Sequence, residues 1–280
     1  MHNPCPIAYQ QHTMRLVVGG MTLEQPTLLT YLQYDSDFLA VRTLSPTGGP
    51  AAGGSEVAVS LLDDRLLLDL GGTLCRFSWP SSGTSTTGVS SSATTHSPTA
   101  THSATTVNAS IDASKHRLRC VAPRPPDGFI PLGRWHADAI VEVSINGNDF
   151  SSSAQPAAFT YYLAEAAAVG ALTPFRGPTS GGTAVSILGK GFLDLGGFLC
   201  RFGAANTGYN LVPATAVSET VARCVSPPLR RLACDAPVEG VRSASDDANS
   251  PSHVRVCVLL NGEECIGGAD RMFTYMNMSP

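Results

Sequence analysis

Short stretches in which apolar residues alternate with polar or small residues recur along the chain. Examples are residues 56–60, 139–145, 183–187 and 253–258. A period of two puts every second side chain on the same face, so each stretch predicts a β-strand with one buried face. Helical periodicity is almost absent. The pattern therefore predicts an all-β protein.

A decapeptide appears twice and predicts a repeat architecture. Residues 68–77 read LDLGGTLCRF, and residues 193–202 read LDLGGFLCRF, with one difference. Other landmarks recur in the same order, among them Gly49-Pro50 with Gly177-Pro178 and Arg119-Cys120 with Arg223-Cys224. Self-similarity on this scale indicates that each copy is one structural unit.

The landmarks divide the chain into three parts. Residues 40–162 and 168–276 are two full copies, and residues 1–36 echo only the C-terminal half of a third. A Ser/Thr-rich insertion at 81–114 is expected to be a loop inside the first full copy. Without it each copy has about 95 residues, the size of an immunoglobulin-like sandwich of about seven strands. The alanine-rich segment 162–171 is compatible with a helical turn, but we expect an extended linker.

Asn-Gly and glycine pairs predict the turns. Asn146-Gly147 and Asn261-Gly262 follow predicted strands, and Asn-Gly tolerates the positive φ angles of a tight hairpin. Gly71-Gly72 and Gly196-Gly197 are expected to turn the chain into the next strand. Asp69 and Asp194 precede these pairs and are expected to have a capping or turn role. Each copy is thus expected to close with a hairpin.

Composition and charge argue against nucleic acid as a partner. The formal net charge is −4, and lysine occurs only as Lys115 and Lys190. A protein that neutralises phosphates usually has a basic face, whereas the arginines here are scattered. The first eleven residues lack the basic and apolar regions of a secretory signal, and no apolar run is long enough to span a bilayer. We expect the chain to be a fragment, so these absences say little about location.

Eight cysteines are present, and four occupy matched positions in the two full copies. This placement suggests one disulfide per copy, Cys75 with Cys120 and Cys200 with Cys224, each stabilising by roughly 3 to 4 kcal/mol through loop closure. The alternative is buried free thiols in a cytosolic protein. Spacing does not support a zinc site, because Cys-x-x-Cys and a companion histidine pair are absent.

The sequence pattern does not determine the disulfide partners of the remaining cysteines. Cys234, Cys257 and Cys265 occur only in the last copy, and one pair among them is expected without the sequence choosing it. Cys257 and Cys265 flank the Asn261-Gly262 turn at nearly facing positions. Cys5 belongs to the truncated copy and is expected to be an orphan.

Two N-glycosylation sequons begin at Asn108 and Asn277. The first lies in the Ser/Thr-rich tract, which has too few apolar residues to form a core. In an exported chain Asn108 would be a glycan acceptor, and the alternative is an unmodified insertion.

Motifs that would carry catalysis are missing. Gly189-Lys190-Gly191 has the wrong spacing for a phosphate-binding loop and lacks the following Ser or Thr. Neither a Gly-x-Ser-x-Gly nucleophile elbow nor a His-Glu-x-x-His motif occurs. Asp63-Asp64 and Asp246-Asp247 lack the alternating pattern of an EF-hand calcium loop. We therefore expect no catalytic residues, no metal and no cofactor.

The ordered landmarks resemble the IPT/TIG domain, an immunoglobulin-like fold shared by plexins, related receptors and some transcription factors. The resemblance is strongest in the last copy, at Pro174, Gly177, Pro178, Gly181, Gly182, Gly189, Gly191, Phe192, Cys200, Phe202, Gly203, Cys224, Pro227, Pro228, Asn261, Gly262, Phe273 and Tyr275. The first copy departs from it at residues 61–67, at Ser78 and in the insertion. The resemblance implies tandem β-sandwiches, joined repeat cysteines as in extracellular members, and no catalytic residues.

Three functions follow as expectations. The leading one is an extracellular or cell-surface array that recognises or spaces a protein or glycan ligand, with any membrane attachment supplied by segments outside this chain. The second is a nuclear factor whose sandwich assists DNA binding or dimerisation, against which the shortage of lysine weighs. The third is an accessory module of a larger carbohydrate-active enzyme.

Overall fold

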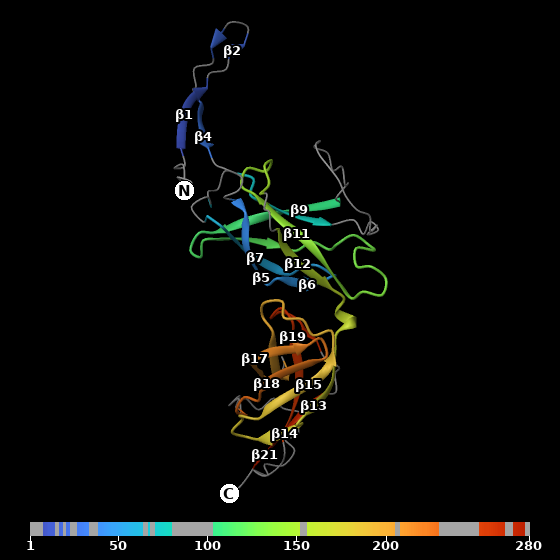
Figure 1. Ribbon diagram of the computed structural model, residues 1–280. Helices are drawn as coiled ribbons and strands as arrows, with labels where there is room; N and C mark the ends of the chain where they lie inside the picture. Colours follow the sequence, from blue (N-terminus) through green and yellow to red (C-terminus); the bar gives the residue numbers. More distant parts are fainter. Residues whose placement is uncertain are drawn as a thin grey trace, which may run out of the picture.

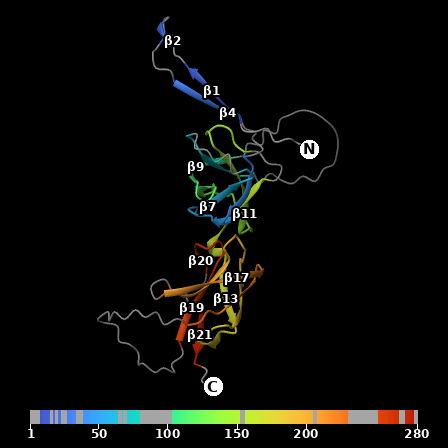
Figure 2. The same ribbon diagram turned by 90° about the vertical axis from the view of Figure 1, so that its left-hand side faces the viewer.

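The computed structural model describes two β-sandwiches arranged end to end, preceded by a β-hairpin, as both views show (Figures 1 and 2). The described residues are 8–14, 17–18, 21–22, 27–33, 39–63, 67, 71–79, 103–151, 156–204, 208–229, 252–266 and 271–277. The prediction of an all-β protein built from immunoglobulin-like sandwiches is confirmed. Cys5, Cys234, Asp69 and most of the insertion lie outside the described residues.

The first sandwich consists of strands β5 to β12. They are β5 (Val41–Ser45), β6 (Gly48–Pro50), β7 (Glu56–Leu61), β8 (Leu74–Trp79), β9 (Ser103–Asp112), β10 (Arg117–Val121), β11 (His136–Ser144) and β12 (Ala157–Tyr162). One layer has the order β5-β7-β10, and the other has β8-β11-β12-β6, with β6 parallel to β12. Alternating burial along β7 and β8 matches the period of two in the sequence.

The second sandwich repeats this arrangement with strands β13 to β21. They are β13 (Ala168–Thr173), β14 (Arg176–Pro178), β15 (Ala184–Lys190), β16 (Leu199–Ala204), β17 (Gly208–Ser218), β18 (Val221–Val225), β19 (Ser252–Leu259), β20 (Cys265–Ile266) and β21 (Met272–Met276). The layers are β13-β15-β18 and β16-β19-β21-β14, and β20 pairs with β19. A cis peptide bond precedes Pro46 and the equivalent Pro174.

One long strand in each sandwich connects the two layers. The first part of β9 pairs with β8, from Ser103 to Asn108, and the second part pairs with β10, from Ala109 to Asp112. In the same way β17 pairs first with β16 and then with β18. The expectation that residues 81–114 form a loop is therefore wrong for 103–112. Their hydroxyl-rich sequence still forms a strand because alternate side chains face solvent while Val107, Ala109 and Ile111 pack against the core.

Each sandwich has its own hydrophobic core between its layers. The first core includes Phe77, Trp79, Phe159 and Tyr161. Phe77 and Trp79 are stacked, and the other ring contacts among them are edge to face or tilted. The second core includes Phe202, Phe273 and Tyr275 at equivalent places. The aromatic residues of the repeated Phe-x-Tyr and Cys-Arg-Phe motifs therefore form the centres of both cores.

The connection between the sandwiches differs from the expected extended linker. Tyr162 ends β12, a single 3-10 turn spans Ala164–Ala166, and β13 begins at Ala168. The backbone N–H groups of Ala166 and Ala167 donate to the carbonyls of Leu163 and Ala164. Alanine lacks a side chain that would compete with this compact turn, so the local helical signal prevailed over the extended interpretation.

The Asn-Gly turns also differ in part from a two-residue hairpin. Gly147 and Gly262 have the expected positive φ angles, 83° and 84°. Five residues, however, separate Leu259 from its partner Cys265 across the second turn. The asparagine side chains shape these wider turns, because Asn146 Oδ1 accepts from the N–H groups of residues 148 and 149, and Asn261 Oδ1 accepts from Glu263.

The N-terminal region contains two short antiparallel pairs. Strand β1 (Ala8–Met14) pairs with β4 (Thr27–Gln33), and β2 (Val17–Val18) pairs with β3 (Met21–Thr22). The β1–β4 pair corresponds in order and direction to β11–β12 of the first sandwich. That residues 1–36 are the rear half of a truncated repeat stays a prediction.

Candidate functional site

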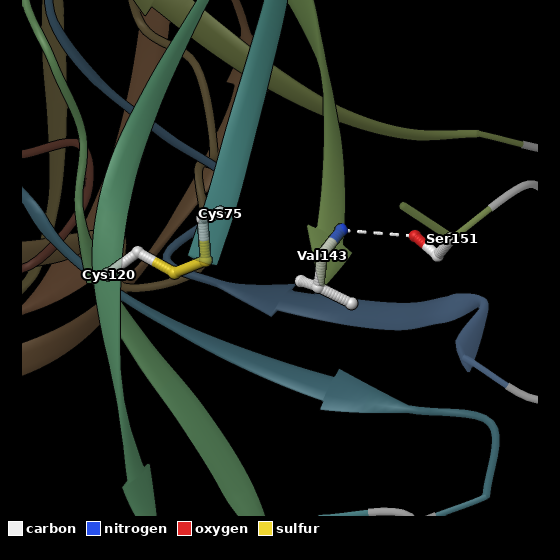
Figure 3. The surroundings of a disulfide bond; sticks show 4 residues. All are labelled: Cys75, Cys120, Val143 and Ser151. Atoms are coloured by element: carbon white, nitrogen blue, oxygen red, sulfur yellow. Dashed lines mark hydrogen bonds between the residues drawn. A yellow bond between two sulfur atoms is a disulfide. The ribbon is translucent and has the colours of Figure 1, made fainter. Parts of the chain in front are cut away.

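A disulfide joins the two layers of the first sandwich. Cys75 on β8 is bonded to Cys120 on β10, with their Cα atoms 6.3 Å apart (Figure 3). Both cysteines are buried among the core side chains. Nearby, the Val143 N–H donates to Ser151 Oγ at 3.1 Å, and the Ser151 N–H donates to the Val143 carbonyl, which holds the loop after the first Asn-Gly turn against β11.

The second sandwich has two disulfides. Cys200 on β16 is bonded to Cys224 on β18, with a Cα separation of 6.4 Å, at the place equivalent to the first sandwich. Cys257 and Cys265 are bonded across the β19–β20 hairpin, with a Cα separation of 5.7 Å. In the register of this hairpin Cys265 faces Leu259, and Cys257, two residues before Leu259 on the same side of β19, is its diagonal neighbour.

A buried tyrosine fastens the repeated Cys-x-x-Pro segment in each copy. The Tyr161 hydroxyl donates to the Pro123 carbonyl at 2.8 Å, and the Tyr275 hydroxyl donates to the Pro227 carbonyl at 2.7 Å. Burial raises the pKa of Tyr161, and it raises the pKa of Tyr275 to about 12. Sequence reasoning identified these tyrosines as landmarks but did not foresee the bond, because its two ends are far apart in the chain.

The two sequons lie on exposed backbone where they are described. Asn108 is exposed on β9, beside Leu74 of β8, and Ser110 of the same sequon is also exposed. Asn277 is exposed immediately after β21, whereas Met278 and Ser279 lie outside the described residues. The Asn108 side chain is therefore accessible on the outer face of the strand.

Polar contacts connect the two sandwiches at the second Asn-Gly turn. The Glu263 carboxylate accepts from the Ser55 hydroxyl at 2.7 Å and from the Glu56 N–H at 3.2 Å. Asn261 Nδ2 donates to the same carboxylate at 3.1 Å, and lies 3.4 Å from both the Gly48 carbonyl and Ser55 Oγ. Figure 1 shows this hairpin, after β19, directed at the β6 end of the first sandwich.

Apolar contacts accompany them. Tyr162 belongs to the first sandwich by its strand, yet its buried side chain packs within the core of the second. Trp135 of the first sandwich is half-buried against the same core, and its carbonyl accepts from the Leu163 N–H. The Thr47 N–H donates to the Leu195 carbonyl at 2.8 Å. We call these polar and apolar contacts together the junction.

The Tyr162 hydroxyl has no hydrogen-bond partner within the described part of the chain. Burial raises the pKa of Tyr162, and the carboxylates of Glu264 and Glu263 raise it further. Sequence reasoning missed the junction entirely. No pattern in the sequence joins Gly48 to Asn261, which lies more than 200 positions away.

Several arginines of the first sandwich are paired with acidic side chains. Arg76 Nε lies 2.8 Å from Glu142, and Arg119 pairs with both Glu56 and Asp112. The Ser114 hydroxyl and Arg119 together hold the pKa of Asp112 at about 2. These cations already have acidic partners, so their charge is largely compensated within the fold.

An exposed row of side chains follows β17 in the second sandwich. Tyr209, Leu211 and Val217 are 50%, 44% and 52% exposed, and the Arg201 guanidinium lies over the Tyr209 ring at 5.4 Å. Tyrosine and arginine are frequent in the centres of protein interfaces.

Among the described residues, no helix is long and apolar enough to cross a membrane, and no group of three or more potential metal ligands gathers.

Comparison with known families identifies the second sandwich. Residues 167–275 match the family model of the IPT/TIG domain. This match covers β13 to β21 and ends at Tyr275, the tyrosine that holds Pro227. No curated protein matches the chain.

Among solved structures, the chain is similar to two of the plexin A4 extracellular region. The structure of domains 1 to 10 gives a TM-score of 0.44 and 16% identity, covering 85% of this chain and 15% of the plexin chain. The structure of domains 1 to 8 gives a TM-score of 0.31 and 10% identity, covering 86% of this chain and 25% of the plexin chain. This chain thus spans a quarter or less of those chains.

Proposed function

Because residues 167–275 form an IPT/TIG domain, we propose that this chain is a non-catalytic β-sandwich array of an extracellular or cell-surface protein. Its role is to space neighbouring domains or to present a surface to a protein or glycan ligand. The observation that carries the proposal is the pair of equivalent disulfides, Cys75–Cys120 and Cys200–Cys224, between β8 and β10 and between β16 and β18. Structural disulfides persist in oxidising compartments and are rare in the cytosol.

Two further observations support this proposal over a nuclear role. Arg76 and Arg119 have acidic partners, so they do not form a free basic face for phosphates. The exposed row with Tyr209 and Leu211 offers an aromatic and apolar surface of the kind that protein partners use. A glycan on Asn108 would stand on the outer face of β9, away from the core.

Counting free thiols tests the disulfides on which the proposed extracellular location depends. The chain is produced with a secretory leader in mammalian cells, denatured without reduction, alkylated and mapped by mass spectrometry. We expect Cys75, Cys120, Cys200, Cys224, Cys257 and Cys265 to be protected until a reductant is added. Alkylation of all four repeat cysteines in unreduced protein would refute the extracellular assignment.

Glycan occupancy is tested on the same material. Treatment with peptide N-glycosidase should remove the glycan mass from the peptide that contains Asn108 and convert that asparagine to aspartate, independently of the second sequon at Asn277. Asn108→Gln should abolish this shift while leaving the disulfide map unchanged, and Asn148→Gln, an exposed asparagine outside any sequon, is the matched control. An unmodified Asn108 in secreted protein would contradict this part of the proposal.

A further inference from the structure

We infer that the Asn261 to Glu263 turn locks the second sandwich onto the first, so that the two reorient in solution as one rigid body. The inference rests on the proposed spacing role, because a spacer must hold a defined distance and direction. Domains joined by small polar contacts move relative to each other by default, so rigidity requires specific contacts.

Comparison with the equivalent turn of the first sandwich shows that the Asn261 turn makes more contacts than its own conformation requires. In the first sandwich Asn146 Nδ2 donates to Asp149 Oδ2 at 2.8 Å, just as Asn261 donates to Glu263 in the second. Asn146 is half-buried, whereas Asn261 is only 4% exposed. The same local turn therefore becomes buried where it meets Gly48 and Ser55 of the other sandwich.

The acceptor in this contact is charged. Ser55 Oγ and the Glu56 N–H both donate to the Glu263 carboxylate, one to each of its oxygens. Hydrogen bonds to an ionised acceptor are stronger than neutral ones, and two donors on two oxygens fix direction as well as distance. The first sandwich thus presents a hydroxyl and an amide at the spacing that this carboxylate requires.

Close approach at the junction depends on glycine. A Cβ atom at Gly48 would lie 2.5 Å from the Thr160 carbonyl oxygen and 3.0 Å from both methyl groups of Leu195. On the opposite side, a Cβ atom at Gly196 would lie 3.6 Å from the Thr47 nitrogen, within ordinary contact. The two surfaces are therefore in direct contact at the level of their backbones.

The connecting segment offers little room for a hinge. Hinge motion requires a few residues that can change φ and ψ freely. Between β12 and β13, the N–H groups of Leu163, Ala166 and Ala167 are all hydrogen-bonded to backbone carbonyls. Tyr162, which precedes them, is held in the core of the second sandwich. The buried tyrosine therefore anchors the connection at one point, and the polar turn, at a second point, fixes the orientation about that anchor.

The experiment measures residual dipolar couplings and ¹⁵N relaxation of the full chain, analysed separately for each sandwich. For the unaltered protein we expect both sandwiches to share one alignment tensor and one rotational correlation time. In the double variant Ser55→Ala/Glu263→Ala we expect that common tensor to be lost and both correlation times to shorten. Dispersed amide shifts and intact disulfides establish that the variant is folded.

The repeat supplies matched controls. Thr183 occupies in the second sandwich the place of Ser55. Asp149 lies one position further along its turn than Glu263 does, but it is likewise the carboxylate that accepts from the asparagine side chain of that turn. The variant Thr183→Ala/Asp149→Ala therefore makes equivalent changes away from the junction and should retain the common tensor. Two tensors in the unaltered protein, or one tensor in the junction variant, would overturn the inference. Either result leaves the thiol and glycan tests of the proposed function unaffected.

Discussion

At the scale of single residues, the repeated landmarks act through contacts between distant segments. Tyr161 and Tyr275 each close their sandwich by donating to a proline carbonyl in the segment after the second repeat cysteine. Proline lacks an N–H group, but its carbonyl still requires a donor when it is buried. The tyrosine and the Cys-x-x-Pro segment of each repeat are therefore the two ends of one buried hydrogen bond.

Removing one of these hydroxyls should destabilise the fold. Tyr275→Phe keeps the buried ring but leaves the Pro227 carbonyl without this donor, and should lower the free energy of unfolding by about 1 to 2 kcal/mol. Chemical denaturation followed by circular dichroism measures the change. Tyr209→Phe is the control, because Tyr209 is half-exposed, and an equal loss in that variant would contradict the assignment.

The same tyrosine should make stability sensitive to alkaline pH. Burial raises the pKa of Tyr275 to about 12, above the value of about 10 in an unfolded chain. A raised pKa means that the unfolded state releases its proton first, so the contribution is complete below about pH 10 and is lost as pH rises towards 12. Denaturation midpoints at pH 8, 10 and 11 should fall less in Tyr275→Phe than in the unaltered protein.

Two adjacent glycines should respond unequally to the same substitution. Gly181 and Gly182 have φ angles of 77° and 84°, so alanine is strained at both. A Cβ atom at Gly181 would lie 2.6 Å from the backbone at Pro227 and Pro228, whereas nothing lies within 4 Å of one at Gly182.

We expect Gly182→Ala to cost about 1 to 2 kcal/mol, from backbone strain alone. Gly181→Ala should cost more, because the backbone after Cys224 must also move. Denaturant titration of the two variants ranks them, and the opposite order would show that the Pro227 segment yields easily.

At the scale of elements, two kinds of feature connect the layers of each sandwich. They are the strands β9 and β17, through hydrogen bonds, and the repeat disulfides, through covalent bonds. Each strand pairs with one layer along its first part and with the other layer along its second part. Each repeat disulfide joins the layers covalently between strands on either side of that strand. The shared strands and the disulfides both oppose separation of the layers, in addition to the hydrophobic core between them.

The disulfides should differ in their contribution according to the loops that they close. The sequence separations are 45, 24 and 8 for the Cys75, Cys200 and Cys257 pairs. On the loop-entropy relation these correspond to about 4, 3.5 and 2.5 kcal/mol. Replacing each pair by alanine and measuring unfolding should reproduce this order, with the Cys257–Cys265 pair the least costly to remove.

At the scale of the whole molecule, the two sandwiches are not independent units. Tyr162 ends the last strand of the first sandwich but packs in the core of the second. A substitution in one sandwich should therefore lower the stability of the other. This coupling is separate from the polar turn at Glu263 and acts on stability rather than on orientation.

We expect Tyr162→Ala to destabilise the second sandwich by about 3 to 5 kcal/mol, the cost of truncating a large buried aromatic residue. Hydrogen exchange should show lost protection at β16 and β19 with smaller changes at β7 and β10. Tyr162→Phe is the control and should be nearly neutral, because the hydroxyl has no partner within the described residues. Losses confined to the first sandwich would contradict the coupling.

Sequence reasoning anticipated the all-β class, the sandwich fold and the IPT/TIG identity of residues 167–275, because these depend on periodicity and on ordered landmarks. It misread residues 103–112 as loop, since they lie in a Ser/Thr-rich tract and composition was given more weight than alternation. It expected an extended linker where Ala164–Ala166 form a 3-10 turn. In both places the correct signal was local, the alternation in 103–112 and the alanines of 164–166, and it was given too little weight.

The sequence by itself determined the strands, the turns at the glycines and the equivalence of the cysteines, because a period of two and an internal repeat are local properties of the chain. Only the tertiary structure decided that Tyr161 and Tyr275 bond the proline carbonyls, that Cys257 pairs with Cys265, and that Glu263 meets Ser55. These contacts join residues from 8 to 208 positions apart. Their partners are selected by how strands and sandwiches pack, and no local pattern encodes that packing.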